Sequence, residues 1–101
     1  MRTIFIKSFG EFLVGRDEGQ QAYEVFKRDY VDTYPNETFF CDFTGVKILA
    51  PSYGDEVFGR LQQEYPDKFV IDQGIPHALR VALDTVEETR RIVFKYASHA
   101  G

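Results

Sequence analysis

The chain has 101 residues, of which 44% are hydrophobic and 16% aromatic, and this length and composition are typical of one globular domain. The formal net charge of −4 excludes the broad basic surface on which general nucleic-acid binding depends. Cys41 is the single cysteine, so neither an internal disulfide nor a cysteine-based zinc site is expected. No apolar run approaches the roughly 20 residues of a membrane span. We therefore expect a cytoplasmic domain that binds neither nucleic acid nor membrane.

The first third of the chain predicts a β-hairpin followed by an amphipathic helix. Short apolar runs at residues 3–6 and 12–14 flank a Ser-Phe-Gly segment, which favours a hairpin. Asp17 is then the expected N-cap of a helix, with Gln20 at the position from which a side chain reaches back to the cap. The helix is expected to end before Pro35. Its buried stripe recurs every four residues and comprises Ala22, Phe26 and Tyr30.

The rest of the chain alternates strands with helices. Residues 38–43 are dense in aromatic and β-forming residues, which predicts a central strand buried on both faces. Ser52 and Asp55 have the spacing of a capping pair at the start of a second amphipathic helix. Residues 69–71 predict another strand, and the last helix is expected to reach about Tyr96. The buried stripe of that last helix comprises Leu79, Ala82, Leu83, Val86 and Val93.

The resulting order, β-β-α-β-α-β-α, predicts a small α/β fold. About four strands are expected in a mixed sheet, and about three helices mainly on one face of it, because strands that alternate with helices are joined by right-handed crossovers. Ligands of such sheets bind beyond the carboxyl ends of the strands. The loops over residues 43–55 and 72–77 are expected to lie at such ends, and the first holds the densest group of polar residues.

Polar residues gather in and beside this loop. A metal-dependent or phosphoryl-handling site would use Asp42 and Asp55 as oxygen ligands and Thr44 or Ser52 as an acceptor hydroxyl group. The alternative is purely structural, in which Asp42 satisfies loop amides and Ser52 caps a helix with Asp55. No Gly-x-Ser-x-Gly elbow surrounds Ser52, and Cys41 lies in an apolar strand as an inert thiol. We therefore do not expect nucleophilic catalysis by Ser52 or Cys41, and no cofactor is expected.

The segment from Cys41 to Gly59, CDFTGVKILAPSYGDEVFG, resembles the STAS domain, the fold of bacterial anti-sigma-factor antagonists. It is more similar still to STAS-like domains of unknown function, whose motif reads roughly Asp-Phe-x-Gly-Val-x-x-Ile-x-x-Ser-Phe-x-Asp-Glu-Leu. The runs Phe12–Arg16 and Phe69–Asp72 also fit that group, so that the resemblance extends from about residue 9 to residue 90. It implies a single STAS-like domain over residues 1–101.

The resemblance implies a non-enzymatic regulatory module that binds a protein partner, such as a histidine-kinase-like ATPase or an anti-sigma factor. In the antagonists, a kinase-like anti-sigma factor phosphorylates a serine at the start of the helix after the central strand. The unphosphorylated form binds that kinase and frees the sigma factor. The family's Asp-Ser-Ser-Gly falls on Ala50–Tyr53, where Pro51 occupies the place of the phosphorylated serine and Ser52 matches the second serine.

Ser52 is therefore the expected phosphoacceptor, in a position where a phosphate charge in a contact face can break an interface. Asp55 and Glu56 lie within one helical turn and are expected to repel that phosphate. Within the strand-to-helix segment 44–58, Ile48, Leu49 and Tyr53 are the expected apolar anchors. The full expected partner-binding set is Thr44, Lys47, Ile48, Leu49, Tyr53, Asp55 and Glu56.

Two other interpretations stay open. One is the metal-dependent or phosphoryl-handling site on Asp42, Thr44 and Asp55. The other is a structural homo-oligomer, for example a homodimer that pairs through the aromatic strand or the last helix.

Overall fold

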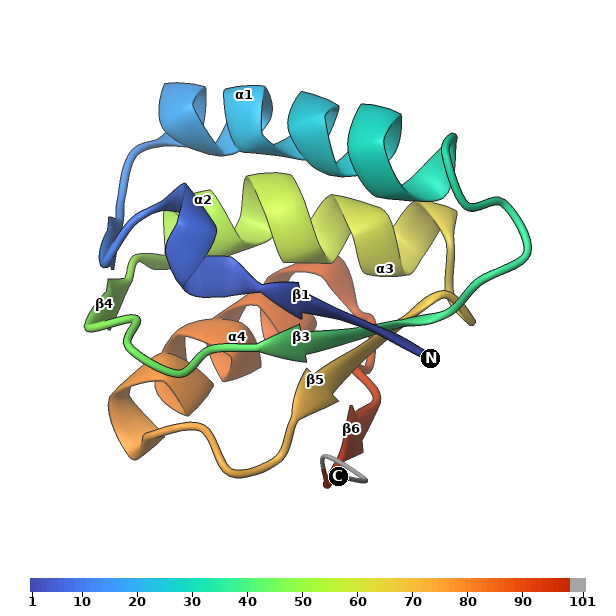
Figure 1. Cartoon of the computed structure of the whole chain (residues 1–101). Coiled ribbons are helices and arrows are strands. Elements are labelled where there is room, and N and C mark those ends of the chain that lie inside the picture. The colour runs from blue at the N-terminus through green and yellow to red at the C-terminus, as the bar shows by residue number, and fades with distance from the viewer. Residues whose placement is uncertain (99–101) are drawn as a thin grey trace.

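The computed structural model describes residues 1–98, which fold around a four-stranded sheet (Figure 1). The strands lie in the order β1-β3-β5-β6, and every neighbouring pair is parallel. This architecture confirms the α/β class. The strand bounds are β1 Arg2–Phe5, β3 Phe39–Asp42, β5 Phe69–Asp72 and β6 Tyr96–Ala97.

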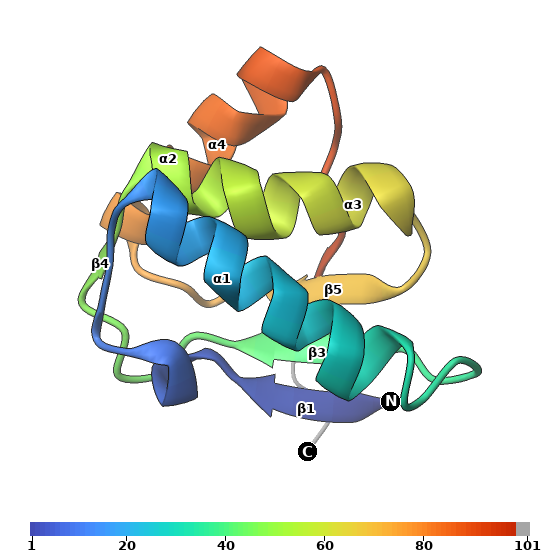
Figure 2. The ribbon, with the colours of Figure 1, turned by 90° about the horizontal axis from the view of Figure 1, so that it is seen from above.

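Three helical segments cover one side of the sheet (Figure 2). The first is α1, Arg16–Phe26, which continues into the π-helical turn η2, Lys27–Val31. The second is one continuous run of α2, Pro51–Gly54, the π-helical turn η3, Asp55–Gly59, and α3, Arg60–Glu64. The third is α4, His77–Arg90. Figure 2 shows the α2–α3 run lying between α1 and α4.

The core lies between these helices and the sheet. Phe39 and Cys41 of β3 are fully buried, as expected for the central strand. The ring of Phe39 stacks on Phe69 of the neighbouring strand, with ring centroids 5.5 Å apart. Phe26 of α1 stacks on Phe9 at 4.6 Å and packs edge-on against Phe58 at 5.8 Å. Aromatic pairs at these distances stabilise a core by about 0.5–1.5 kcal/mol beyond their buried area.

The expected hairpin at the amino end is wrong. A short 3-10 helix, η1 Ile6–Phe9, follows β1 and leads the chain away from the main sheet. The next strand, β2 Phe12–Leu13, pairs in parallel with β4, Ile48–Leu49, to form a separate two-stranded sheet. The apolar runs therefore mark two true strands, whose partners lie far away in sequence.

The last helix is shorter than expected. It ends at Arg90, and Arg91 follows in the left-handed conformation, with φ at 57°. This reversal lets the chain form β6 beside β5, with the amide of Ile71 donating to the carbonyl of Lys95 at 2.7 Å. Val93 is consequently 76% exposed, which corrects its expected place in the buried stripe. The other stripe residues are buried, namely Leu79, Ala82, Leu83 and Val86.

Two expected helix caps are also wrong. Gly15, and not Asp17, precedes the first residue of α1, and Ala50, and not Ser52, precedes the first residue of α2. Neither helix start has a side-chain cap hydrogen bond.

Within residues 1–98, no helix is both long and apolar enough to cross a membrane.

Candidate functional site

The loop after β3 is fixed by its own backbone. A carboxylate oxygen of Asp42 accepts a hydrogen bond from the amide of Thr44 at 2.9 Å. Gly45 has a φ of 87°, which favours glycine, and the amide of Val46 then donates to the carbonyl of Phe43 at 3.0 Å. Asp42 thus satisfies a loop amide, as the structural interpretation expects. The turn directs the chain into β4 and positions the helix that follows.

Pro51 opens that helix at its first position, where a proline nitrogen has no hydrogen bond to lose. Ser52 lies within the first turn and is half-buried. Within residues 1–98, its hydroxyl group makes no hydrogen bond with another protein group. The Ser52 side chain is therefore not needed to hold the helix in place.

The π-helical turn η3 places two acidic side chains among the helices. Asp55 and Glu56 are 19% and 11% exposed at their side chains. Arg16 of α1 donates to Asp55 at 3.2 Å and to Glu56 at 2.6 Å. On the other side, Nε of Arg90 in α4 donates to Asp55 at 2.5 Å. Two arginines from the flanking helices thus bracket two carboxylates of the central helix.

These contacts determine how the Asp55 carboxyl titrates. Partial burial alone would raise its pKa, because burial disfavours the charged form. The hydrogen bonds from Arg90 and Arg16 outweigh that effect and hold the pKa of Asp55 below its usual value. Asp55 is therefore a carboxylate at neutral pH, compensated by two cations. The two acids that we expected to repel a phosphate on Ser52 are thus both paired with arginines.

A cavity of about 130 Å³ lies beside Ser52. It is a small hollow between the start of α2 and the outer turns of α4, with Arg16 of α1 on its wall. The side chain of Arg16 is 54% exposed. The residues that line the cavity are Arg16, Pro51, Ser52, Asp55, Thr85, Val86 and Thr89.

The expected partner-binding residues divide into two groups. Thr44, Lys47 and Ile48 are exposed, with Ile48 at 47%. Leu49 and Tyr53 are only 5% and 4% exposed, so they are core residues and not the surface anchors we expected. They are buried because β4 lies against α4 and because α2 is enclosed by α1 and α4. Asp55 and Glu56 point into the arginine network instead of toward solvent.

Phe12 of β2 and Val14, which directly follows β2, are exposed apolar residues that were missed. Phe12 is 59% exposed and lies opposite Ile48 in the parallel pair, and Val14 is 47% exposed. Arg16 was missed as well. A cation in the first helical turn is disfavoured by the helix dipole, and that unusual position was the available signal that a nearby carboxylate compensates it.

The carboxylates of the alternative metal site take part in different interactions. Asp42 accepts from the loop amide of Thr44, whereas Asp55 holds two arginines. In residues 1–98, no group of three or more His, Cys, Asp or Glu side chains is arranged to hold a metal ion. The geometry therefore gives the metal interpretation no support.

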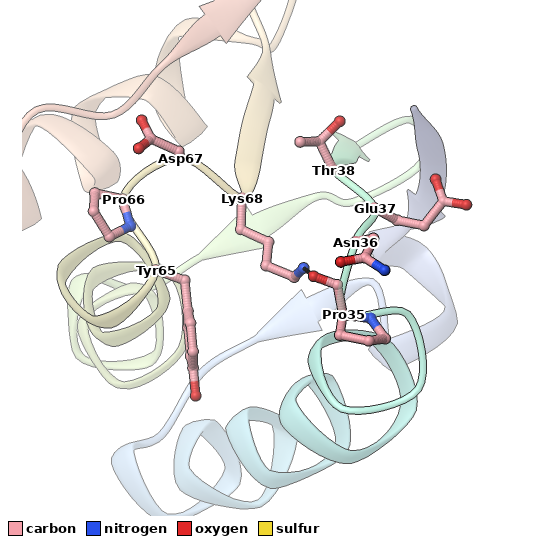
Figure 3. A pocket seen from close by; sticks show the side chains of 8 residues that line it. All are labelled: Pro35, Asn36, Glu37, Thr38, Tyr65, Pro66, Asp67 and Lys68. Atoms are coloured by element: carbon pink, nitrogen blue, oxygen red, sulfur yellow. Dashed lines mark hydrogen bonds between the residues drawn. The ribbon is translucent and has the colours of Figure 1, made fainter.

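A separate hollow of about 370 Å³ lies at the opposite end of the sheet, where β3 and β5 begin (Figure 3). The Lys68 ammonium lies inside it and donates to the carbonyl of Pro35 at 2.7 Å and to that of Tyr34 at 3.2 Å. Lys68 thus ties the loop before β3 to the start of β5. Because ligands of parallel sheets bind at the carboxyl ends of strands, the Ser52 end remains the candidate site.

Comparison with known proteins does not name a relative: no family model, curated protein or solved structure matches the chain.

Proposed function

We propose that this chain is a non-enzymatic regulatory module of the STAS-like type, which binds a protein partner through the surface around Ser52. The proposed partner is a histidine-kinase-like ATPase or an anti-sigma factor, and phosphorylation of Ser52 is the proposed switch. The contact surface comprises the exposed members of the original set, namely Thr44, Lys47 and Ile48, together with Ser52 and the neighbouring Phe12.

The observation that carries this proposal is the state of the Ser52 hydroxyl group. It lies half-buried in the first turn of the helix that follows β3 and β4, and within the described residues it has no hydrogen-bond partner. A serine that capped the helix would lose a structural bond on modification. Ser52 has no such bond to lose, so a kinase can modify it without disrupting the helix start.

The surroundings of Ser52 also favour a switch. A phosphate would add about −1.5 to −2 charges at neutral pH, and Arg16 lines the same small cavity. The acids nearest in sequence, Asp55 and Glu56, are already paired with arginines. The folded domain can therefore accommodate the phosphate, while a partner that packs on Ile48 meets a new negative charge at its edge.

A capture experiment tests the switch. Wild type, Ser52→Ala and Ser52→Asp are used as baits in lysate of the native host, and the retained proteins are identified by mass spectrometry. We expect a histidine-kinase-like ATPase or an anti-sigma factor to be retained by wild type and by Ser52→Ala and lost from Ser52→Asp.

Thr33→Asp is the matched control, because it adds the same charge at an exposed residue after η2, outside the contact surface. It should retain the partner, and calorimetry on the purified pair then measures the affinities. Equal affinity for Ser52→Asp and wild type would refute the switch. A partner that still binds Ile48→Ser as tightly as wild type would refute the contact surface.

A further inference from the structure

A second surface feature lies between β2 and α1, next to the proposed contact surface, with which it shares Phe12. It is a groove of about 310 Å³, which we call the β2–α1 groove. Its floor is formed by core side chains, Leu13, Ala22 and Tyr53, which are 1%, 6% and 4% exposed. Its walls include Phe12 and Val14, both among the exposed large apolar side chains of the domain.

The groove is apolar where a partner would insert and acidic along one rim. Glu18 of α1 lies on this rim, and Asp17 and Glu24 are exposed on the same helix. Asp17 and Glu24 line a neighbouring hollow together with Arg60, whose guanidinium group pairs with two acids of its own helical run, and Gln21 lines both that hollow and the groove. Along the described chain, none of these three carboxylates forms a salt bridge.

Most other acids of the domain are compensated. Glu11 beside β2 pairs with Lys47 at 3.1 Å, and Glu37 pairs with Arg2 at 3.4 Å. The unpaired acids of α1 therefore form a locally negative margin beside an exposed apolar surface. Positive charge on a partner is the complement of such a margin, and complementary charges set partner choice and association rate.

We propose that the β2–α1 groove binds a short amphipathic segment of a partner protein, in which Lys or Arg residues lie beside apolar side chains. The apolar side chains insert over Leu13 against Val14, and the cations face Glu18 and the acids along α1. A second copy of this chain is disfavoured as the occupant, because it would bring the same acidic margins together. The inference rests on the proposed function only in that the chain is a binding module, and it does not involve Ser52.

Two synthetic peptides test the proposal. Each has about 14 residues in an amphipathic leucine pattern, one with lysine and the other with glutamate at the polar positions. Their binding to the full chain is followed by fluorescence anisotropy at low and at physiological salt. We expect the lysine peptide to bind, with an affinity that falls as salt rises, and the glutamate peptide not to bind.

Variants locate the binding. Val14→Ser should weaken the lysine peptide by roughly five- to tenfold, since it removes an apolar contact at the groove wall. Glu18→Gln should weaken it by roughly two- to fivefold, since it removes one exposed charge pair, and should reduce the salt dependence. Val81→Ser and Glu88→Gln are the matched controls, because they change an exposed valine and an exposed glutamate on α4. Both controls should bind like wild type.

The proposal is overturned if the groove variants bind the lysine peptide as wild type does, or if the control variants weaken it equally. Binding of the glutamate peptide with comparable affinity also overturns it. Light scattering that shows a dimer lost in Val14→Ser would assign the groove to a second copy instead. Because Ser52→Asp leaves the groove intact, failure of the proposed switch and failure of the groove are separate results.

Discussion

Replacement of Asp55 by Asn removes the charge at the centre of the arginine network and keeps the side-chain shape. In the native protein this carboxylate accepts hydrogen bonds from Arg16 at 3.2 Å and from Arg90 at 2.5 Å. Hydrogen bonds to charged groups stabilise a fold by about 1.5–3 kcal/mol each. The Asn oxygen still accepts from one arginine, and Arg16 is more than half exposed, so water solvates it when it is released. We therefore expect Asp55→Asn to lower the free energy of unfolding by about 1–2 kcal/mol.

The dependence of this loss on pH identifies its cause. The pKa of Asp55 in the folded protein lies below the value of 3.8 taken for an unperturbed side chain. The wild-type carboxylate therefore contributes its full stabilisation above about pH 4, and that contribution is lost as the pH falls through the folded-state pKa. The difference in stability between wild type and Asp55→Asn should be constant near neutrality and shrink in acid.

Urea unfolding measures both quantities. With a denaturant dependence of about 2 kcal/mol per molar, in the middle of the range for small domains, the expected loss moves the midpoint by roughly 0.5–1 M. Asp84→Asn is the matched control, because its exposed pair with Arg80 spans 3.3 Å on one face of α4 and is worth at most about 0.5 kcal/mol. Equal midpoints for wild type and Asp55→Asn at neutral pH would refute the reasoning. So would a loss that stays undiminished in acid.

Two further predictions concern packing. An ideal Cβ on Gly19 would lie 2.9 Å from Cβ of Glu56 and 3.3 Å from backbone atoms of Tyr53, whereas one on Gly54 would meet Val86 at an ordinary 3.5 Å. Thermal melts should therefore show Gly19→Ala destabilised by about 1–3 kcal/mol, because of overpacking, and Gly54→Ala stabilised by about 0.5–1 kcal/mol, because alanine has the higher helix propensity. Equal effects of the two substitutions would contradict the close approach of α1 to α2. Cys41 is fully buried, and burial raises its pKa to about 12. A thiol reagent at mild alkaline pH should therefore label Cys41 of the native protein at least about 100-fold more slowly than Cys41 of the protein unfolded in urea. Rapid labelling of the native protein would place this strand nearer the surface.

The helices and strands with a clear hydrophobic pattern were predictable from sequence, because that pattern depends on residues close together in the chain. The aromatic run around Phe39 gave a strand buried on both faces, and the stripe from Leu79 to Val86 gave α4. The pairing of β2 with β4 was not predictable, because 34 residues lie between Leu13 and Ile48 and each strand has only two residues. The end of α4 was missed because its apolar pattern continues to Val93, although Arg91 turns the chain.

The candidate site was predictable in position and less so in detail. Ser52 and the exposed Ile48 follow from strand order and the rule that sites lie at the carboxyl ends of strands. Leu49 and Tyr53 were assigned to the surface because they are apolar residues in a loop-like segment. They are buried because that segment forms β4 and a helix in the middle of the helical layer. Burial of this kind depends on contacts with α1 and α4, which no local pattern reveals.

The central place of the α2–α3 run explains both its composition and where its function can lie. Residues 56–59 are all buried, so this helix is enclosed on several sides by α1, α4 and the sheet. Acidic groups in such a position are costly unless they are paired, and one arginine from each flanking helix supplies the compensation. The charges of Asp55 and Glu56 are therefore used inside the fold. The amino end of this run is its more accessible part, with Pro51 exposed and Ser52 half-buried, and it is there that the proposed function locates the partner contact.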